Sequence, residues 1–167
     1  MSLYLRPILF FVFLFSTFSL HAQNTPMPDW SLTDESGQQF EAGDFKNKPL
    51  VIHFWATWCP YCKKLQPGLE SLKQKYASQG VEFIAISFWE DEGVSPQTHL
   101  TQRGITIPTL IKGDSVAREL FGVEGTPTTI FVDHKGIIVG STRTSDPENP
   151  LLEKATRYLL DEYLAVK

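Results

Sequence analysis

Residues 50–64 read LVIHFWATWCPYCKK, and this short segment decides the fold of the chain. Its first part, Leu50 to Trp55, is a nearly continuous apolar run of the kind that is buried on both faces in a parallel sheet. From Pro60 onward the apolar residues follow a helical spacing instead. The two cysteines of the chain, Cys59 and Cys62, lie at the junction. The segment therefore predicts a buried strand, a tight turn and a helix that begins with a pair of thiols.

The placement of the thiols points to redox chemistry. A thiol in the first turn of a helix lies close to unpaired backbone N–H groups and to the positive end of the helix dipole, and both favour the thiolate. Cys59 is therefore expected to be a poised nucleophile. Cys62 follows about one helical turn later, so it can attack a mixed disulfide formed on Cys59. The pair can thus cycle between dithiol and disulfide.

Metal binding is the main alternative for a Cys-x-x-Cys motif. A structural zinc site normally has four sulfur or imidazole ligands, and this chain has no further cysteine. No two of its histidines are three to five residues apart: they are His21, His53, His99 and His134. We therefore expect no zinc site and no cofactor. A two-thiolate site for a soft metal and an inert structural disulfide stay open.

The first 22 residues have the pattern of a secretory signal peptide. An apolar run from Ile8 to Leu20 follows Arg6 and ends at His21-Ala22, a small-residue cleavage site. The run is shorter than the ~20 residues that a membrane-spanning helix needs. Residues 3–5 could extend it, so an uncleaved anchor stays open. We predict a signal peptide over residues 1–22 and a periplasmic or other extracytoplasmic location for residues 23–167.

Charge and length limit the partners and the number of domains. The formal net charge is −4, with acids and bases interspersed, so the chain has no basic stripe for nucleic acid and no polybasic patch for lipid. Residues 23–167 are enough for one domain, and no long polar or low-complexity linker divides them. We expect one monomeric domain.

The helix that begins at Pro60 is expected to be amphipathic, with a kink at Pro67. Its apolar side is formed by Leu65, Leu69, Leu72 and Tyr76. The side left for solvent carries Lys63, Lys64, Glu70, Lys73 and Lys75.

The remaining elements alternate along the chain. A glycine turn between short alternating segments predicts a hairpin over residues 30–40. Further strands are predicted at 81–88, 108–112, 128–132 and 137–141, and helices at 95–103, 115–121 and 151–164. Parallel βαβ units followed by an antiparallel hairpin and a helix imply an α/β fold. Its mixed sheet is covered by helices, with the dithiol at the carboxyl end of a central strand.

Two motifs together resemble the thioredoxin superfamily. They are FWATWCPYCKK at residues 54–64 and GTPTT at residues 125–129. The likeness is greater to the exported TlpA, ResA and CcmG (DsbE) group, whose domain is related to redoxin and AhpC/TSA proteins, and it covers roughly residues 26 to 164. It implies a thioredoxin-like fold with an N-terminal β-hairpin and a central insert, and a thiol–disulfide oxidoreductase activity.

The resemblance also implies roles for single residues. Cys59 would be the exposed attacking thiol, and Cys62 the buried resolving thiol. Pro127 would be a cis-proline facing the dithiol, and Thr126 before it would offer backbone groups to an extended substrate. Pro108 is the competing candidate for the cis-proline, because the group carries a proline in its insert.

Two further residues are candidates for proton transfer. Glu90 follows the strand predicted at 81–88, where ResA-type proteins carry an acid near the dithiol, and it could take the proton from Cys62. His53 occupies a strand position that holds a buried acid in thioredoxins. It could shuttle protons near neutral pH or, if charged, favour a thiolate. The alternatives are a solvated loop acid at Glu90 and a hydrogen-bonded core residue at His53.

The residues next to the cysteines are candidates for substrate contact. Trp58 is expected to pack beside the dithiol, where core packing and substrate binding cannot be separated. The pair Pro60-Tyr61 between the cysteines is that of glutaredoxins, which leaves the use of glutathione unproven. A peroxiredoxin site would need Pro-x-x-x-Thr-x-x-Cys, but Ile52 and Ala56 stand at the two required positions.

The sequence thus predicts an exported reductase of disulfides. Its expected clients are exported proteins, among which apocytochrome c is the first candidate, and its electrons would come from a membrane thiol carrier. A disulfide oxidase or isomerase of the same fold is the first alternative. A copper chaperone that holds Cu(I) between the two thiolates is an alternative from another class.

Overall fold

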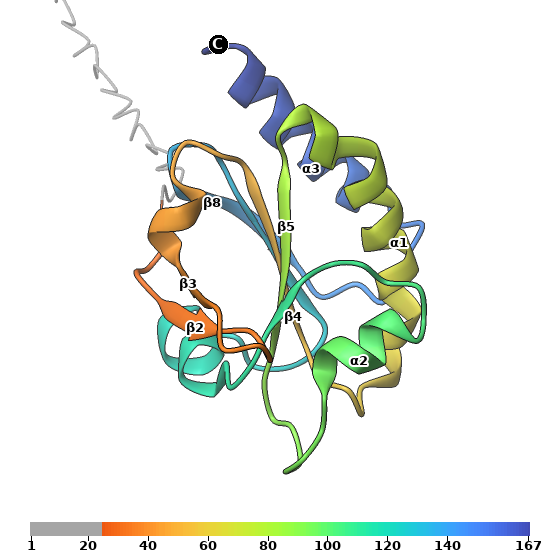
Figure 1. Ribbon diagram of the computed structural model, residues 1–167. Helices are drawn as coiled ribbons and strands as arrows, with labels where there is room; N and C mark the ends of the chain where they lie inside the picture. Colours follow the sequence, from red (N-terminus) through yellow and green to blue (C-terminus); the bar gives the residue numbers. More distant parts are fainter. Residues whose placement is uncertain (1–24) are drawn as a thin grey trace, which may run out of the picture.

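The computed structural model describes residues 25–167, which form a mixed sheet with helices on its faces (Figure 1). The six-stranded sheet has the order β1-β8-β7-β4-β5-β6, and β2 and β3 form a separate hairpin. The strands are β1 Thr25–Pro26, β2 Ser31–Thr33, β3 Gln39–Glu41, β4 Leu50–Trp55, β5 Glu82–Ser87, β6 Thr109–Leu110, β7 Thr128–Val132 and β8 Ile137–Thr142. The α-helices are α1 Pro60–Tyr76, α2 Pro96–Thr101 and α3 Pro150–Leu164. Shorter helices are η1 Ala42–Phe45, η2 Ala77–Gln79 and η3 Val116–Leu120.

Strand β4 lies in the middle of the sheet, as its nearly continuous apolar sequence predicts. All six of its residues are buried. It pairs in parallel with β5 and antiparallel with β7, so that His53 lies between Ala85 and Thr129. Because β4 and β5 run in the same direction, both end at one edge of the sheet, and this edge carries the cysteine turn.

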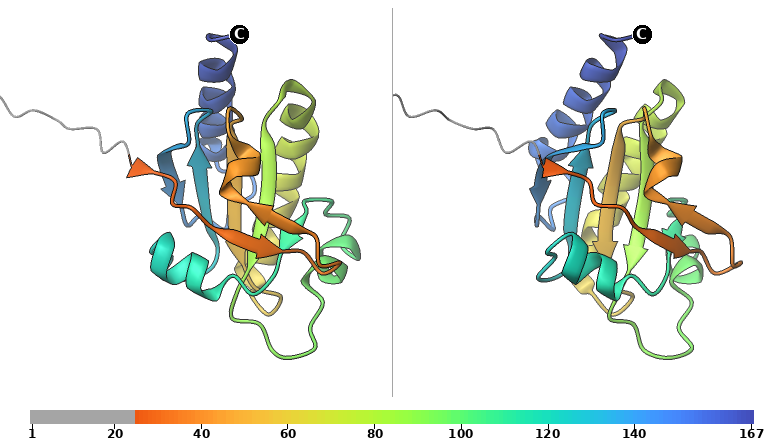
Figure 2. Two further views of the ribbon diagram at one scale, coloured as in Figure 1. Left: turned by 60° about the vertical axis from the view of Figure 1, so that its left-hand side comes forward. Right: turned by 90° about the vertical axis from the view of Figure 1, so that its left-hand side faces the viewer.

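The two faces of the sheet are covered by different elements. Helices α1 and α3 lie side by side on one face, whereas the β2–β3 hairpin, η1 and η3 lie on the other (Figures 1 and 2). The alternation of side chains along β4 matches this division. Val51 and Trp55 belong to the apolar cluster on the α1 side, and Ile52 and Phe54 to the cluster on the hairpin side. The predicted α/β fold, with a mixed sheet flanked by helices, is therefore confirmed.

Most elements confirm the sequence predictions in type and place. The strand over residues 50–55 has the predicted bounds, and the hairpin is present as β2 and β3. Ser95 caps α2, accepting a hydrogen bond from the backbone of Thr98, and Pro96 stands at the first helical position. The strand predicted at 108–112 is shorter, covering Thr109–Leu110, and the short helix near residue 116 has π-helical bonding. Strand β1, which pairs with β8, has no counterpart among the predictions.

Helix α1 continues through Pro67. A proline lacks the backbone N–H that would bond the carbonyl four residues earlier, here that of Lys63. The guanidinium of Arg103 takes its place, since its Nη2 donates to the Lys63 carbonyl at 2.8 Å. The segment after α2 thus completes the hydrogen bonding of α1 just behind the cysteines.

The prediction that Glu70 faces solvent is wrong. Its side chain is 5% exposed and accepts hydrogen bonds from the backbone N–H of Thr106 at 2.8 Å and from the Thr106 hydroxyl at 2.7 Å. Burial opposes ionisation of this carboxyl, but the hydrogen bonds from Thr106 outweigh it, so the pKa of Glu70 lies below its usual value. The helical spacing could not show that residues 105–107 pack over this turn of α1.

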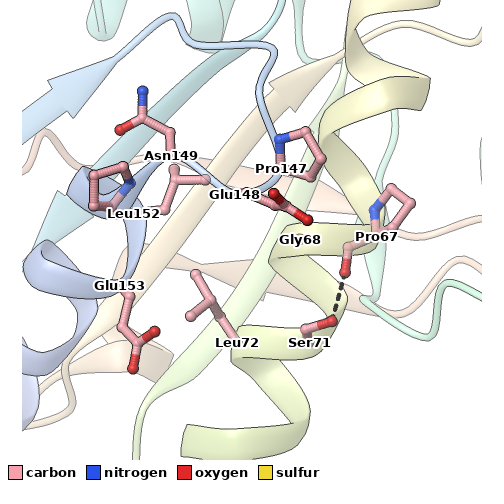
Figure 3. Close-up of a pocket in the computed structure, with 10 residues that line it drawn as sticks. Pro67, Gly68, Ser71, Leu72, Pro147, Glu148, Asn149, Leu152 and Glu153 are labelled. Atoms are coloured by element: carbon pink, nitrogen blue, oxygen red, sulfur yellow. Dashed lines mark hydrogen bonds between the residues drawn. The ribbon is translucent and has the colours of Figure 1, made fainter.

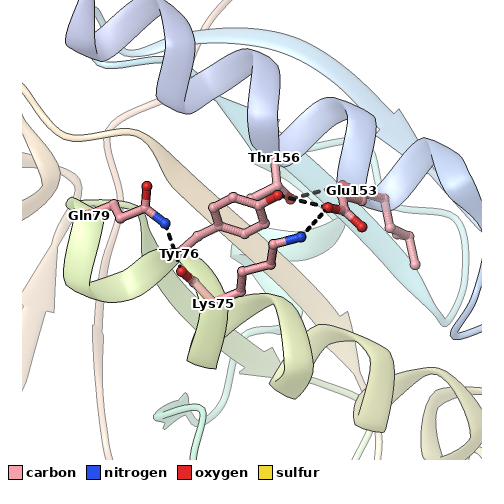
Figure 4. Close-up of polar contacts among 6 residues, drawn as sticks. Lys75, Tyr76, Gln79, Glu153 and Thr156 are labelled. Atoms are coloured by element: carbon pink, nitrogen blue, oxygen red, sulfur yellow. Dashed lines mark hydrogen bonds and ion pairs between the residues drawn. The ribbon is translucent and has the colours of Figure 1, made fainter.

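Helix α1 contacts α3 and the segment just before it at two points. Near the start of α3, Gly68 faces Pro147 so closely that a Cβ would lie 2.8 Å from the Pro147 Cα, beside a shallow pocket (Figure 3). Near the end of α1, Glu153 accepts hydrogen bonds from the Lys75 ammonium at 2.5 Å and the Tyr76 hydroxyl at 2.9 Å (Figure 4). The close approach at Gly68 and the hydrogen bonds of Glu153 together fix α3 against α1.

The predicted signal peptide, residues 1–22, lies outside the residues that the structure describes. Among residues 25–167 no helix is both long and apolar enough to cross a membrane.

Candidate active site

The two cysteines lie at the N-terminus of α1 and are joined as a disulfide. Cys59 is the N-cap residue, and Pro60 occupies the first helical position, which its fixed φ suits. The backbone N–H of Cys62 donates to the Cys59 sulfur at 3.1 Å. This N–H is one of the helix donors that have no partner within the helix. In the reduced protein the same donor and the helix dipole would stabilise a thiolate on Cys59.

Both sulfur-bearing residues are buried in this oxidised form. Cys59 is 2% exposed and Cys62 is fully buried. The expected exposed thiol at Cys59 is therefore not exposed here, since its sulfur is bonded to Cys62 and turned toward the helix. The neighbours of the cysteines are exposed instead: Pro60 and the aromatic residues Trp58 and Tyr61, which are 51% and 62% exposed.

Glu90 holds the turn that leads into the dithiol. Its carboxylate accepts hydrogen bonds from the backbone N–H of Thr57 at 2.8 Å and from the Thr57 hydroxyl at 2.5 Å. A third hydrogen bond comes from the Ser87 hydroxyl at 2.7 Å. Glu90 is half-buried and does not lie free in a solvated loop. It connects the end of β5, at Ser87, to Thr57, which follows β4 and lies two residues before Cys59. A role of Glu90 in taking the proton of Cys62 stays a prediction.

His53 lies in β4 two residues from both Val51 and Trp55, so its side chain is on the same, α1-covered face as theirs. It is 2% exposed, its Nδ1 lies 3.4 Å from the Thr129 hydroxyl, and its Nε2 has no hydrogen-bond partner. Burial lowers the pKa of His53 to about 3, so the ring is neutral at pH 7. The expectation that a charged His53 favours the thiolate is thus not supported, because the sheet and α1 exclude water from it. Proton shuttling stays a prediction.

The peptide bond between Thr126 and Pro127 is cis. It is the one cis bond among residues 25–167, so the competing candidate Pro108 is trans. Thr128, the next residue, pairs with Phe54 of β4, which brings Pro127 to the edge where the cysteine turn begins. The hydroxyl of Thr128 donates to the Gly125 carbonyl at 2.7 Å and fixes the loop. The dithiol and the cis-proline loop therefore share one edge of the sheet.

Three residues of this site were not predicted from the sequence. Thr57 and Ser87 hold Glu90, and Trp89 accepts a hydrogen bond on its backbone carbonyl from the Trp58 indole N–H at 2.6 Å. Their positions at the carboxyl ends of two adjacent parallel strands were the available signal, since such ends meet at one edge. The sequence did not show which strand neighbours β4.

Comparison with known proteins agrees with this geometry. The sequence profile of the Redoxin family matches residues 22–159. The thiol-disulfide oxidoreductase ResA of Geobacillus kaustophilus is 31% identical over 134 residues, which are 78% of this chain and 76% of that protein. ResA of Geobacillus thermodenitrificans is 30% identical, over 75% of this chain and 74% of the relative.

Solved structures share the fold. A crystal structure of a thiol:disulfide interchange protein, DsbE, from Chlorobium tepidum has a TM-score of 0.72 at 23% identity, covering 82% of this chain and 96% of that one. The Cys-x-x-Cys turn and the cis-proline loop lie at one edge of the sheet, and the relatives by sequence are thiol-disulfide oxidoreductases. The chain belongs to the Redoxin family, and it is a thiol–disulfide oxidoreductase that is similar in sequence to ResA and in fold to DsbE.

Proposed function

We propose that the protein works as a reductant, which breaks disulfides in exported client proteins. The observation that carries the exchange chemistry of this proposal is the position of Cys59 as the N-cap of α1, where the Cys62 N–H points at its sulfur. The reducing direction is the part that the reduction potential tests. A thiolate stabilised there is a good nucleophile at neutral pH.

The reaction has two exchange steps. In the reduced protein the Cys59 thiolate attacks one sulfur of the client disulfide; the client S–S bond breaks, and its other sulfur leaves as a thiolate that is protonated from water. Cys62 then loses its proton and attacks the Cys59 sulfur. This releases the second client thiol and leaves the Cys59–Cys62 disulfide, the form that the structure describes. One client disulfide is reduced for each dithiol that is oxidised.

Residues around the dithiol have distinct proposed roles. Cys59 attacks and Cys62 resolves, while Glu90, or His53 in its neutral form, accepts the Cys62 proton. The backbone of Thr126 pairs with an extended client segment, and Pro127 excludes other backbone conformations there. Trp58, Pro60 and Tyr61 form the surface against which the client lies. The support for these last roles is the shared edge of the sheet and the exposure of Trp58 and Tyr61.

The setting of the reaction is also a proposal. The signal-like residues 1–22 favour an extracytoplasmic protein, in which oxidised Cys59–Cys62 must be reduced again by a membrane thiol carrier. Apocytochrome c, with cysteines that must be reduced, is the first candidate among the clients. We propose that the protein acts as a monomer.

Trapping of clients tests this proposal. A Cys62→Ser variant cannot resolve the mixed disulfide, so it should accumulate covalent complexes with clients through Cys59. The complexes should be recovered from cells under denaturing, thiol-blocked conditions and released by dithiothreitol. The matched control is the double variant Cys59→Ser, Cys62→Ser, which should trap none. Absence of trapped proteins in both would contradict the proposal.

A further inference from the structure

Two tryptophans near the dithiol are exposed, although each is held by a hydrogen bond. Trp58, the residue before Cys59, is 51% exposed, and Trp89, in the loop after β5, is 36% exposed. The loop that carries Trp89 and the turn into α1 lie at the same end of the sheet (Figure 2). Large aromatic side chains bury much area when they find a partner, so their exposure next to a reactive centre calls for an explanation.

The backbone of Trp89 holds the indole of Trp58. The Trp58 Nε1–H donates to the Trp89 carbonyl at 2.6 Å. Trp89 has a φ of 59°, in the left-handed region, and its own N–H donates to the Asp114 carboxylate at 3.1 Å. A bulky residue adopts this conformation only under strain, and such residues gather at functional sites. The chain thus keeps Trp89 where a glycine or asparagine would be less strained.

The ring of Trp89 is fixed as well. The Phe88 ring lies 4.8 Å from it, centroid to centroid, and the guanidinium of Arg118 lies 5.6 Å from its centroid. Arg118 comes from η3, which precedes the loop of the cis-proline. The ring therefore has two partners and an exposed remainder that stays available for a third.

We propose that Trp58 and Trp89 form a preorganised aromatic surface that binds an apolar side chain of the client, aromatic by preference, close to the client disulfide. The inference rests on the proposed function. A client sulfur bonded to Cys59 lies close to Trp58, the residue before Cys59 in the chain, and the Trp58 indole is hydrogen-bonded to the backbone of Trp89. The surface is therefore continuous with the place where the client is attacked. Trp89 is a specificity-determining residue of the reaction.

Preorganisation is what gives this surface its selectivity. A side chain that is already fixed loses little conformational freedom on binding, so the contact contributes to affinity. Aromatic pairs contribute beyond the area that they bury, which favours a phenylalanine over an alanine in the client by about fivefold in kcat/KM.

Substitution of Trp89 tests the inference through selectivity. Two symmetric disulfides of a short cysteine peptide serve as substrates, one with phenylalanine and one with alanine two residues before the cysteine. The wild-type protein should reduce the phenylalanine peptide with the higher kcat/KM. In Trp89→Asn, which suits the left-handed backbone and keeps the carbonyl for Trp58, the ratio should fall clearly toward one. Trp89→Tyr should restore most of the ratio.

The control variant is Tyr158→Ala, which removes a half-exposed aromatic side chain from α3. It should keep the wild-type ratio. An unchanged ratio in Trp89→Asn, or a wild-type protein without preference, would overturn the inference while reduction of hydroxyethyl disulfide still supports the proposed function. A wild-type protein that reduces none of these disulfides would contradict both.

Discussion

Helix α1 is used in opposite ways at its two ends. At its N-terminus the backbone N–H groups are free of helix partners, and one of them points at the Cys59 sulfur. Farther along, side chains are paired: Glu70 is bonded to Thr106, and Tyr76 to Glu153. The comparison indicates that the reactive thiol lies where the helix has unpaired N–H donors, whereas side chains of the later turns keep the helix in place. Substitutions at one end should change the chemistry, and those at the other end the stability.

The largest effect is expected from Cys59→Ser. A hydroxyl is a poor nucleophile and cannot form a disulfide, so reduction of disulfide substrates should fall to the background rate. Thermal unfolding of the variant should match that of the reduced wild-type protein. Residual turnover of the purified variant would show that the reactive end of α1 is not the active site.

Leu69→Ala should give the largest effect on stability at the other end. Leu69 is 1% exposed in the cluster between α1 and the sheet, and its truncation should lower the free energy of unfolding by about 2–5 kcal/mol. Denaturant unfolding measures this change. The rate of disulfide reduction per folded molecule should stay near that of the wild type at low temperature; a loss comparable to that of Cys59→Ser would break the division of α1 into two ends.

Glu90→Gln sharpens the comparison, because Glu90 acts on the reactive end from outside the helix. Glutamine can keep only part of the three hydrogen bonds to Thr57 and Ser87. We expect the turn before Cys59 to loosen and the rate of client reduction to fall by about tenfold. The pH dependence of Cys59 alkylation should shift as well. Asp91→Asn, in the same loop but exposed, is the matched control and should change neither quantity.

Glu70→Gln is expected to have the smallest effect, about 1 kcal/mol at pH 7. The pKa of Glu70 is below its usual value in the folded protein, so its ionised form stabilises the fold above the ordinary carboxyl pKa. This contribution is lost as the pH falls through the lowered pKa. The difference in melting temperature between wild type and variant should therefore be present at pH 7 and shrink toward pH 3. A constant difference would contradict the assigned role of the carboxylate.

The sequence alone predicted those features that a local pattern of residues defines. Strand β4 has the predicted bounds because five of its six residues from Leu50 to Trp55 are apolar, His53 being the exception, and the dithiol follows shortly after it. Pro127 was predicted as cis from the resemblance, and the bond is cis. These features depend on local sequence, so they can be recognised without knowing which strands are neighbours.

What the sequence missed depends on contacts between distant segments. Glu70 is buried with its carboxylate bonded to Thr106, and the Trp58 indole is hydrogen-bonded to the carbonyl of Trp89, whose backbone is left-handed. The short strand β1 exists only because β8 offers it an edge. Helical or strand periodicity carries no information on such partners, since it reports which side of an element is apolar and not what lies against it.

The reduction potential of the Cys59–Cys62 pair tests the central claim most directly. It would be measured on the protein without residues 1–22 by equilibration with dithiothreitol and glutathione buffers and by counting free thiols. A reductant of exported proteins should have a potential near or below about −230 mV. A value of about −120 to −180 mV would mark an oxidase or isomerase and contradict the proposed direction of electron flow.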